Sequence, residues 1–469
     1  MKQNNFFLFA IMVVLFSLAA HSNKNLTNPP LNPELWITKA DQSMLLQRVG
    51  NKPATASPDA ATIAVDAAKQ YQTIDGFGYT LTGGSAVLIN QLPADKKKAL
   101  LNELFGSGAQ SIGISYLRLS MGSSDLDSVT FSYNDLPAGQ TDNTQSKFSL
   151  RPDKANLIPL LKEILAINPH LKIIAAPWSA PVWMKDNNNT KGGSLKPEYY
   201  DSYATYFVKY IQSMQAEGIN ITAITPQNEP YHPGNNPSLY MTAVMQRDFI
   251  KNNLGPAFKK NKLTTKIVVY DHNLDKPFYA DTIYQDAAAS KYVDGAAFHL
   301  YAGNVSAMGQ LHDRFPDKNL YFTEEWTGSN GSFSGDLLWH TKNVIIGTMR
   351  NWSKAALEWN LANDPLFKPH TPGGCTQCKG ALTINGAAIT RNVSYYIIAH
   401  VSKFVPAGSR RIESTPVNGL TNVAFITPAG KKVLILLNEN DTAISFNLQD
   451  RKKKALLTIP GKAVATLRF

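Results

Sequence analysis

Two glutamates stand where polar loops follow short apolar runs. Glu229 lies in "TPQNEP", directly after the run "INITAI", and Glu324 lies in "LYFTEEW". Aromatic and polar residues follow other runs of this kind: Trp178, His299, Tyr301 and Trp359. Indole faces cover the apolar faces of a sugar ring, and carboxylates bind its hydroxyls. Cleavage of a glycosidic bond needs two carboxylates, one to protonate the leaving oxygen and one to attack the sugar or activate water.

Glu324 and Glu325 are adjacent, and only one of them is expected to face the site. Successive residues of a strand point to opposite sides, and only one of the two can face the mouth of a regular barrel. The strand pattern alone leaves both choices open. The glutamate that turns away could still act as a hydrogen-bonding group behind the site.

Each candidate also has a simpler explanation. Glu229 could be an exposed loop carboxylate, and Trp178 and Trp359 could be ordinary core aromatics, because tryptophan is commonly buried. We expect His299 and Tyr301 to orient the carboxylates and not to react, unless they only support the scaffold. Arg118 could pair with Glu324 and hold it ionised, or could form a plain structural salt bridge.

Eight strand-then-polar-loop segments organise most of the chain. They are "TIDGFGYTLTGG", "GISYLRLSMGSSD", "LKIIAAPWSAP", "ITAITPQNEP", "KIVVYDHN", "GAAFHLYAGN", "LYFTEEW" and "AALEWNL". Most are separated by enough residues for a helix. This alternation predicts an α/β fold, a (β/α)8 barrel, whose reacting groups sit at the carboxyl ends of the strands. A doubly wound open sheet is the alternative, but no G-x-G-x-x-G opens a helix after the first strand.

The helix before the Glu229 loop is the clearest of these connections. Between Tyr199 and Met214, aromatic and apolar residues recur at helical spacing, and Gly218 then ends the helix. "INITAI" follows as a short β-branched strand. Glu229 is therefore expected at the carboxyl end of the fourth strand.

The C-terminal part changes character. "NVAFIT", "KVLILLN", "AISFNL", "KALLTI" and "AVATLRF" follow one another at hairpin-like intervals. This spacing predicts an accessory antiparallel β-sandwich. The strand-like "TIAVD" before the barrel is expected to join it. We predict an N-terminal segment at 23–73 that joins the sandwich, a catalytic barrel at 74–400 and C-terminal sandwich strands at 401–469.

The N-terminus has the features of a secretory signal peptide. Lys2 precedes the apolar run Phe6–Ala20, and Ala20 and Ser22 fit a cleavage site, which predicts a signal peptide at 1–22. We therefore expect a secreted or periplasmic protein with no integral membrane segment after cleavage. An uncleaved anchor that tethers an envelope structural protein is the alternative.

Net charge and cysteine content further narrow the range of possible functions. The 469 residues carry a formal net charge of +11, but the lysines are scattered and no nucleic-acid motif accompanies them. The only cysteines, Cys375 and Cys378, lie in "GGCTQCKG". In an exported chain they favour a local disulfide that clips a loop. Zinc would need more ligands than these cysteines and His370 provide.

Seven ordered motifs resemble glycoside hydrolase family 30, which includes lysosomal glucosylceramidase. They are "GFGYTLTGGSA", "PWSAPVWMK", "TPQNEP", "AFHLY", "YFTEEW", "EWNLANDP" and "SKFVPAGSRRI", running from about Ile74 to Ile412. The resemblance implies a (β/α)8 barrel with a side β-sandwich. It places the acid/base on Glu229 and the nucleophile on Glu324 rather than Glu325. It gives Asn228 a contact to the sugar 2-hydroxyl, for which a turn or cap role is the alternative.

The chain also departs from glucosylceramidase. Where the first motif of that enzyme is taken to hold a glucose-gripping aspartate, the aligned residue is Gly83, and the loop after "EWNLANDP" carries the C-x-x-C pair. We expect Gly83 to open the cleft and the C-x-x-C loop to form one of its walls. Both features resemble the endo-β-1,6-glucanase branch of the family.

These observations predict an exported, monomeric, retaining β-glycoside hydrolase that acts on β-1,6-glucan or gluco-oligosaccharides. Glu229 and Glu324 are the expected catalytic pair. Trp178, Asn228, Tyr301 and Trp359 are expected to bind substrate, with Arg118 and His299 in support. No metal or organic cofactor is implied, and a carbohydrate is the only expected partner. Glucosylceramide hydrolysis and a non-catalytic carbohydrate-binding barrel are the alternatives.

Overall fold

The computed structural model describes residues 31–50 and 54–469, together with Met1. Apart from Met1, the predicted signal peptide, including Lys2 and the run Phe6–Ala20, lies outside the described residues. Among the described residues, no helix combines the length and apolar character needed to cross a bilayer.

Eight parallel strands close into a barrel, and each comes from one of the eight predicted segments. The (β/α)8 prediction is therefore confirmed, and the open doubly wound sheet is excluded. The strands are β4 (Gly76–Thr80), β5 (Tyr116–Ser120), β6 (Lys172–Ala176), β7 (Ala223–Ile224), β8 (Lys266–Asn273), β9 (Val293–His299), β10 (Asn319–Glu324) and β12 (Ser353–Asn360). Only the last two residues of "INITAI" form β7. Just before them, the Thr222 hydroxyl bonds the Ile173 carbonyl at 2.6 Å, so a side chain takes part in the pairing with β6.

Side chains from seven of these strands fill the barrel interior. The cluster contains small and large residues together: Tyr116, Ile174, Ala223, Val268, Ala297, Tyr321, Ala355 and Leu357. All are at most 2% exposed. The barrel is therefore a packed core and not a pore, and open space begins only above the strands' carboxyl ends.

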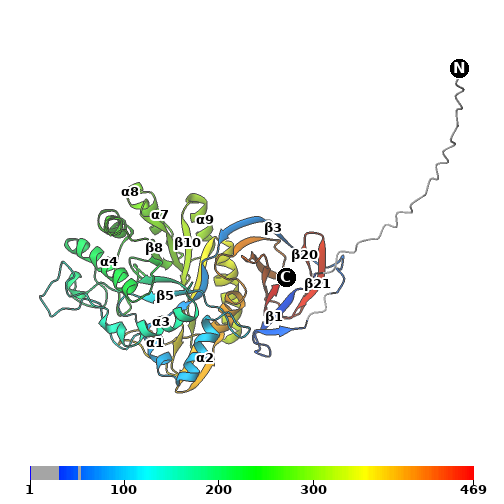
Figure 1. Ribbon diagram of the computed structural model, residues 1–469, viewed down its shortest axis with the longest axis horizontal. Coiled ribbons are helices and arrows are strands. Elements are labelled where there is room, and N and C mark those ends of the chain that lie inside the picture. The colour runs from blue at the N-terminus through cyan, green and yellow to red at the C-terminus, as the bar shows by residue number, and fades with distance from the viewer. Residues whose placement is uncertain (2–30, 51–53) are drawn as a thin grey trace.

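Helices surround the barrel strands (Figure 1). They are α1 (Gly83–Asn90), α2 (Ala94–Phe105), α3 (Leu157–Ile167), α4 (Tyr200–Ala216), α5 (Ala243–Phe249), α6 (Gly255–Lys260), α7 (Phe278–Tyr284), α8 (Ala287–Ser290), α9 (Ser306–Arg314), α10 (Phe333–His340), α11 (Thr348–Arg350) and α12 (Val393–Ser402). π-Helical turns at Ile250–Leu254 and Thr341–Gly347 join α5 to α6 and α10 to α11. As predicted, α4 buries its aromatic face and ends before Gly218, whose φ of 83° suits glycine.

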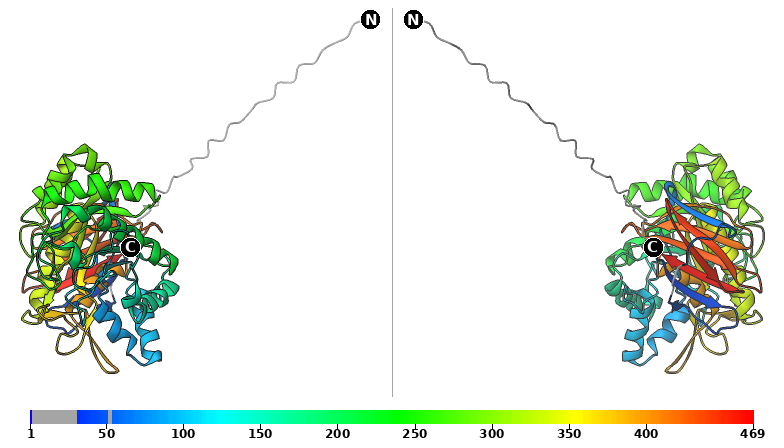
Figure 2. Two further views of the ribbon diagram at one scale, coloured as in Figure 1. Left: turned by 90° about the vertical axis from the view of Figure 1, so that its left-hand side faces the viewer. Right: turned by 90° about the vertical axis from the view of Figure 1, so that its right-hand side faces the viewer.

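A second sheet of nine strands packs beside the barrel (Figure 1). Its strands are β1 (Glu34–Lys39), β2 (Gln47–Val49), β3 (Thr62–Thr73), β17 (Arg410–Ser414), β18 (Leu420–Ile426), β19 (Lys432–Asn438), β20 (Ile444–Asp450), β21 (Lys453–Ile459) and β22 (Ala463–Arg468). Strands from both ends of the chain lie side by side in it (Figure 2). Pairing is antiparallel except between β3 and β20, which run parallel.

Short strands complete the rim of the barrel. β11 (Thr327–Gly328) follows β10 and pairs with β14 (Cys378–Lys379). β13 (Ala362–Asn363) follows β12 and pairs with β15 (Leu382–Asn385), which pairs in turn with β16 (Ala388–Arg391). The cysteine loop is thereby held against the residues that follow Glu324.

His400 joins the two domains from α12. Its Nδ1 lies 2.9 Å from the Thr466 hydroxyl and its Nε2 lies 2.8 Å from the Thr38 hydroxyl. The Thr466 hydroxyl donates to the His400 carbonyl, which leaves it to accept from Nδ1–H. The Thr38 hydroxyl can then donate to an unprotonated Nε2. Full burial of this neutral imidazole lowers the pKa of His400 to about 3.

This burial predicts a loss of stability in acid. An unfolded histidine takes up a proton below about pH 6.5, whereas folded His400 stays neutral down to about pH 3. The free energy of unfolding should therefore fall below about pH 6.5, by up to about 1.4 kcal/mol per pH unit from this group. Denaturant unfolding of wild type and His400→Gln across this range should show the steeper fall in wild type. Parallel curves would contradict the assignment.

Candidate active site

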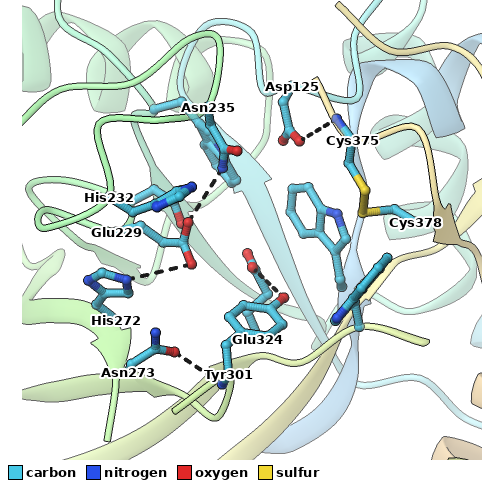
Figure 3. A pocket seen from close by; sticks show the side chains of 14 residues that line it. Asp125, Glu229, His232, Asn235, His272, Asn273, Tyr301, Glu324, Cys375 and Cys378 are labelled. Carbon is cyan, nitrogen blue, oxygen red and sulfur yellow. Dashed lines mark hydrogen bonds and ion pairs between the residues drawn. A yellow bond between two sulfur atoms is a disulfide. The ribbon is translucent and has the colours of Figure 1, made fainter. Parts of the chain in front are cut away.

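A cavity of about 430 Å³ opens above the carboxyl ends of the barrel strands (Figure 3). It is lined by six of the residues proposed from the sequence: Trp178, Asn228, Glu229, Tyr301, Glu324 and Trp359. The other two, Arg118 and His299, are fully buried and bond the carboxylates that line it. The barrel therefore gathers in one place residues that lie as far apart in the chain as Arg118 and Trp359.

The Asp271 carboxylate is the centre of the buried network below the cavity. Oδ2 accepts from Arg118 at 2.8 Å and from the Thr225 hydroxyl at 2.7 Å. Oδ1 accepts from the Thr323 hydroxyl at 2.6 Å and faces His299 Nε2 at 3.1 Å. Although burial alone would raise it, the pKa of Asp271 is held far below its usual range by Arg118, His299 and Thr323. Asp271 is therefore a permanent anion that anchors two cations.

An irregular strand end aims Asp271 inward. Tyr270 and Asp271 both have left-handed backbones, with φ of 74° and 71°, and the pairing of β8 with β9 shifts register between Tyr270 and His272. Such a bulge redirects side chains at a barrel rim. Here Asp271 lies in the buried network while the next residue, His272, reaches the cavity.

The Arg118 guanidinium bridges the carboxylates of Asp271 and Glu324. Its Nη1 donates to Glu324 Oε2 at 2.6 Å, and its Nη2 donates to Asn228 Oδ1 at 2.5 Å as well as to Asp271. The guanidinium also lies over the Trp178 ring, 4.7 Å from its centroid. The Tyr301 hydroxyl donates to the other oxygen of Glu324 at 2.8 Å. Both Glu324 oxygens are thus held by a donor.

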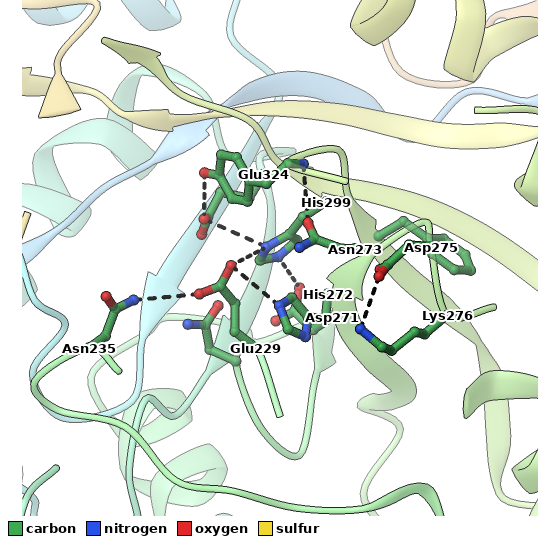
Figure 4. Close-up of polar contacts among 12 residues, drawn as sticks. Glu229, Asn235, Asp271, His272, Asn273, Asp275, Lys276, His299 and Glu324 are labelled. Atoms are coloured by element: carbon green, nitrogen blue, oxygen red, sulfur yellow. Dashed lines mark hydrogen bonds and ion pairs between the residues drawn. The ribbon is translucent and has the colours of Figure 1, made fainter. Parts of the chain in front are cut away.

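His299 lies between the two glutamates (Figure 4). Its Nδ1 is 3.3 Å from Glu229 Oε1 and 3.6 Å from Glu324 Oε1. Burial would lower its pKa, but the carboxylates of Glu324, Asp271 and Glu229 together raise the pKa of His299 to about 10. An imidazolium donates from both nitrogens. His299 is therefore a fixed cation that positions both glutamates.

Glu229 is held by its backbone more than by its side chain. It has a φ of 44°, which is uncommon for a residue other than glycine or asparagine. Its amide donates to the Asp271 carbonyl at 3.0 Å, and its carbonyl accepts from His232 at 2.8 Å. Strain of this kind persists where the surroundings impose it, and it clusters at functional sites. Glu229 is buried, with 7% of the residue exposed, and it lines the cavity, so it is no surface-loop carboxylate.

The spacing of the two glutamates is informative. One oxygen of Glu229 and one of Glu324 lie within 4.8 Å of each other. Carboxyl groups about 5–5.5 Å apart allow direct attack on a sugar carbon, whereas inverting enzymes leave about 6.5–9.5 Å for a water molecule. The separation therefore fits a nucleophile and a proton donor on opposite sides of one glycosidic bond.

Glu229, His299 and Glu324 also lie close enough together to hold a metal ion. Their donor atoms are occupied by other contacts, however. Both His299 nitrogens face carboxylates, and both Glu324 oxygens accept hydrogen bonds. The arrangement works as a hydrogen-bonded ion network.

One wall of the cavity is aromatic. Trp178 and Trp359 stack with their ring centroids 5.4 Å apart and pack against Cys378 and Leu126. Both indoles are buried but line the cavity, so they are core residues and a potential sugar platform at once. Cys375 and Cys378 form the predicted disulfide, and their loop is a wall of the cavity as expected.

Glu325 and Gly83 were both expected near the site, and neither of them lines the cavity. Glu325 does not line the cavity, and its carboxyl accepts a hydrogen bond from the Trp326 amide at 3.3 Å. The expectation that Gly83 leaves open space in the cleft is wrong. Gly83 does not line the cavity, and a Cβ there would lie 1.7 Å from Asp127 Oδ1, so the position is already filled by a neighbouring loop.

Several residues of the site were missed by the sequence analysis. Asp271 and His272 stand in "YDHN", where three polar residues after an apolar strand were a usable signal. Asp125, in the loop after β5, lines the cavity, and burial, with the charge of Glu324, raises its pKa to about 7. Asn235, which donates to Glu229 at 3.4 Å, and Trp326 also line the cavity.

Comparison with family models matches the chain almost throughout. The glycosyl hydrolase family 30 TIM-barrel domain matches residues 74–405, and the glycosyl hydrolase family 30 β-sandwich domain matches residues 408–467.

Individual relatives fall into two groups. The Aspergillus fumigatus endo-1,6-β-D-glucanase neg1 is 32% identical over 437 residues, covering 87% of each chain. The mouse lysosomal acid glucosylceramidase is 29% identical, covering 89% of this chain and 85% of the relative. Among solved structures, the endo-β1,6-glucanase BT3312 matches with a TM-score of 0.87 at 38% identity, covering 93% of this chain and 99% of that one.

The network predicts a histidine that stays charged at neutral pH. In wild type, His299 should keep protons on both ring nitrogens up to about pH 10. Asp271→Asn removes one of the carboxylates that stabilise this cation, so the pKa of His299 should fall. Long-range ¹H–¹⁵N NMR of the imidazole would measure both. Asp275→Asn, which changes an exposed carboxylate just after the same strand, is the control and should leave the titration unchanged. A wild-type His299 that loses its proton near pH 7 would contradict the network.

Proposed function

The chain belongs to glycosyl hydrolase family 30, and we propose that it is a retaining endo-hydrolase of β-1,6-linked glucan. The observation that carries the retaining mechanism is the pair of glutamates, with oxygens within 4.8 Å of each other at the base of an aromatic-walled cavity. In this proposal Glu324 attacks the anomeric carbon while Glu229 protonates the leaving oxygen. Glu229 then deprotonates the water that releases the sugar.

The charges around Glu229 and Glu324 favour one proton shared between these two glutamates. Three carboxylates (Asp271, Glu229 and Glu324) face two cations (Arg118 and His299), so protonating one glutamate balances the network. Burial and the charge of Glu229 raise the pKa of Glu324. At Glu229, burial is outweighed by His299, His272 and His232, which lower its pKa. These directions alone would place the proton on Glu324.

The hydrogen bonds favour the opposite placement, and we adopt it. Glu324 receives a charged donor at 2.6 Å and a hydroxyl at 2.8 Å, whereas the donors to Glu229 lie at 3.3 and 3.4 Å. Short charge-assisted bonds stabilise the ionised form most. In addition, burial lowers the pKa of His272 to about 4, so this residue is neutral at higher pH and gives Glu229 little charge stabilisation there. Glu324 is then the anionic nucleophile and Glu229 the proton donor.

Sugar contacts follow from the cavity lining. Trp178 and Trp359 provide faces for a glucosyl ring, and Asn228 and Asp125 provide polar groups beside them. One Asp125 oxygen accepts from a backbone amide, which leaves the other for a sugar hydroxyl. Arg118 and His299 act through the glutamates and are positioning residues.

The preference for β-1,6-glucan is supported by likeness to named relatives. The glucanases from Aspergillus fumigatus and Trichoderma harzianum are 32% and 34% identical, and the solved glucanase BT3312 is 38% identical. Glucosylceramide is the second candidate, because glucosylceramidases match at 27–32% identity. We propose export from the cell on the basis of the N-terminal sequence.

Exchanging each glutamate should separate their roles. Glu324→Ala should lose all turnover because no group remains to attack the sugar. Glu229→Ala should form the glycosyl-enzyme from an aryl β-glucoside with a good leaving group and then stall. Azide should rescue it and give a β-glycosyl azide, identified by NMR.

The neighbouring glutamate provides a matched control. Burial raises the pKa of Glu325 to about 8, so Glu325→Gln mimics the protonated residue already present at neutral pH. This variant should keep most of the activity. Azide rescue of Glu324→Ala with a β-glycosyl azide as product would reverse the assigned roles.

The substrate should be decided by direct comparison. Purified protein incubated with β-1,6-glucan should release a series of gluco-oligosaccharides early in the reaction, as seen by chromatography. Glucosylceramide should be cleaved slowly or not at all. Release of glucose from glucosylceramide with an intact glucan would overturn the substrate assignment and leave the two-glutamate mechanism standing.

A further inference from the structure

We propose that the Cys375–Cys378 disulfide is a substrate-positioning device, which holds a backbone amide against Asp125 and so fixes that carboxylate in the cavity. This inference rests on the proposed function, because it assigns a role within the sugar-binding site. It concerns residues that lie outside the glutamate network.

The two cysteines differ in how firmly they are held. Cys378 is buried, packs against Trp178 and Trp359, and belongs to β14, which pairs with β11 directly after the Glu324 strand. Its carbonyl accepts from the Asn363 side chain at 2.7 Å. Cys375 is only partly buried and lies outside any strand. The disulfide therefore ties Cys375 to the firmly held Cys378 and restrains its position (Figure 3).

Cys375 uses that position to contact Asp125. Its amide donates to Asp125 Oδ2 at 3.2 Å, the one hydrogen bond from another residue that the described structure gives this carboxylate. The Asp125 carbonyl accepts from the Thr371 amide at 2.9 Å, so the start of the cysteine loop also lies on the Asp125 loop. A Cβ at Gly374 would lie 2.4 Å from that carbonyl, which shows how closely the loops pack.

Stability alone explains the disulfide poorly. It closes a loop across a sequence separation of only three residues, and cross-links that close short loops restrict the unfolded chain least. Its position matters more, since both cysteines line the cavity beside Asp125. Without the cross-link the Cys375 amide loses its connection to β14, so Asp125 is held less firmly before a sugar binds.

A double-mutant cycle on an aryl β-glucoside tests this role. Cys375→Ser/Cys378→Ser should raise KM by about ten-fold, the loss of one hydrogen bond to a charged group, with kcat nearly unchanged. Asp125→Ala should raise KM at least as much. In the Asp125→Ala background, removing the disulfide should change KM little further, because the disulfide acts through Asp125.

The controls separate this role from a structural one. Gln377→Ala alters an exposed side chain between the two cysteines and should leave KM unchanged. Melting curves identify variants that fail to fold, and Cys375→Ala then provides a second way to remove the cross-link. Independent effects of the disulfide and Asp125 on KM, or a lower melting temperature with an unchanged KM, would overturn the proposal. A wild-type protein that cleaves no β-glucoside would instead overturn the proposed function.

Discussion

The buried carboxylate of Asp271 is the constraint on which the active site depends. It bonds Arg118 and His299, and each of these cations bonds one or both glutamates that line the cavity. A buried charge is stable only when it is paired and fully hydrogen-bonded. Asp271 meets this condition with four partners from four different segments of the barrel. The network fixes the glutamates before a sugar enters, as transition-state stabilisation by preorganised charges requires.

The barrel supplies the rigidity that this network needs. Its interior is packed with side chains up to the level of the strand ends, so the charged groups rest on a core with no room to relax. The irregular features stand above that level: the bulge at Tyr270 and Asp271, and the left-handed backbone of Glu229. Regular strands thus provide the support, and local departures from them direct the reacting groups.

Much of this arrangement was predictable from the sequence. Short apolar runs separated by helical patterns gave the eight strands, and the positions of Glu229 and Glu324 at strand ends led to both glutamates. Asp271 was missed because "YDHN" reads as an ordinary polar loop after an apolar strand. A pattern of period two cannot foresee the bulge that turns it inward. Gly83 was misread because sequence shows a missing side chain but not the Asp127 carboxylate that fills its place.

The proposed mechanism depends on a covalent bond between Glu324 and the sugar. The most direct test incubates the protein with an activated 2-deoxy-2-fluoro-β-glucoside, whose glycosyl-enzyme breaks down slowly, and maps the labelled peptide by tandem mass spectrometry. We expect one added fluoroglucosyl group, on the carboxyl of Glu324 and not on Glu325. A label on Glu325 or Glu229 would contradict it, as would an unlabelled protein that still hydrolyses β-glucosides with inversion of configuration.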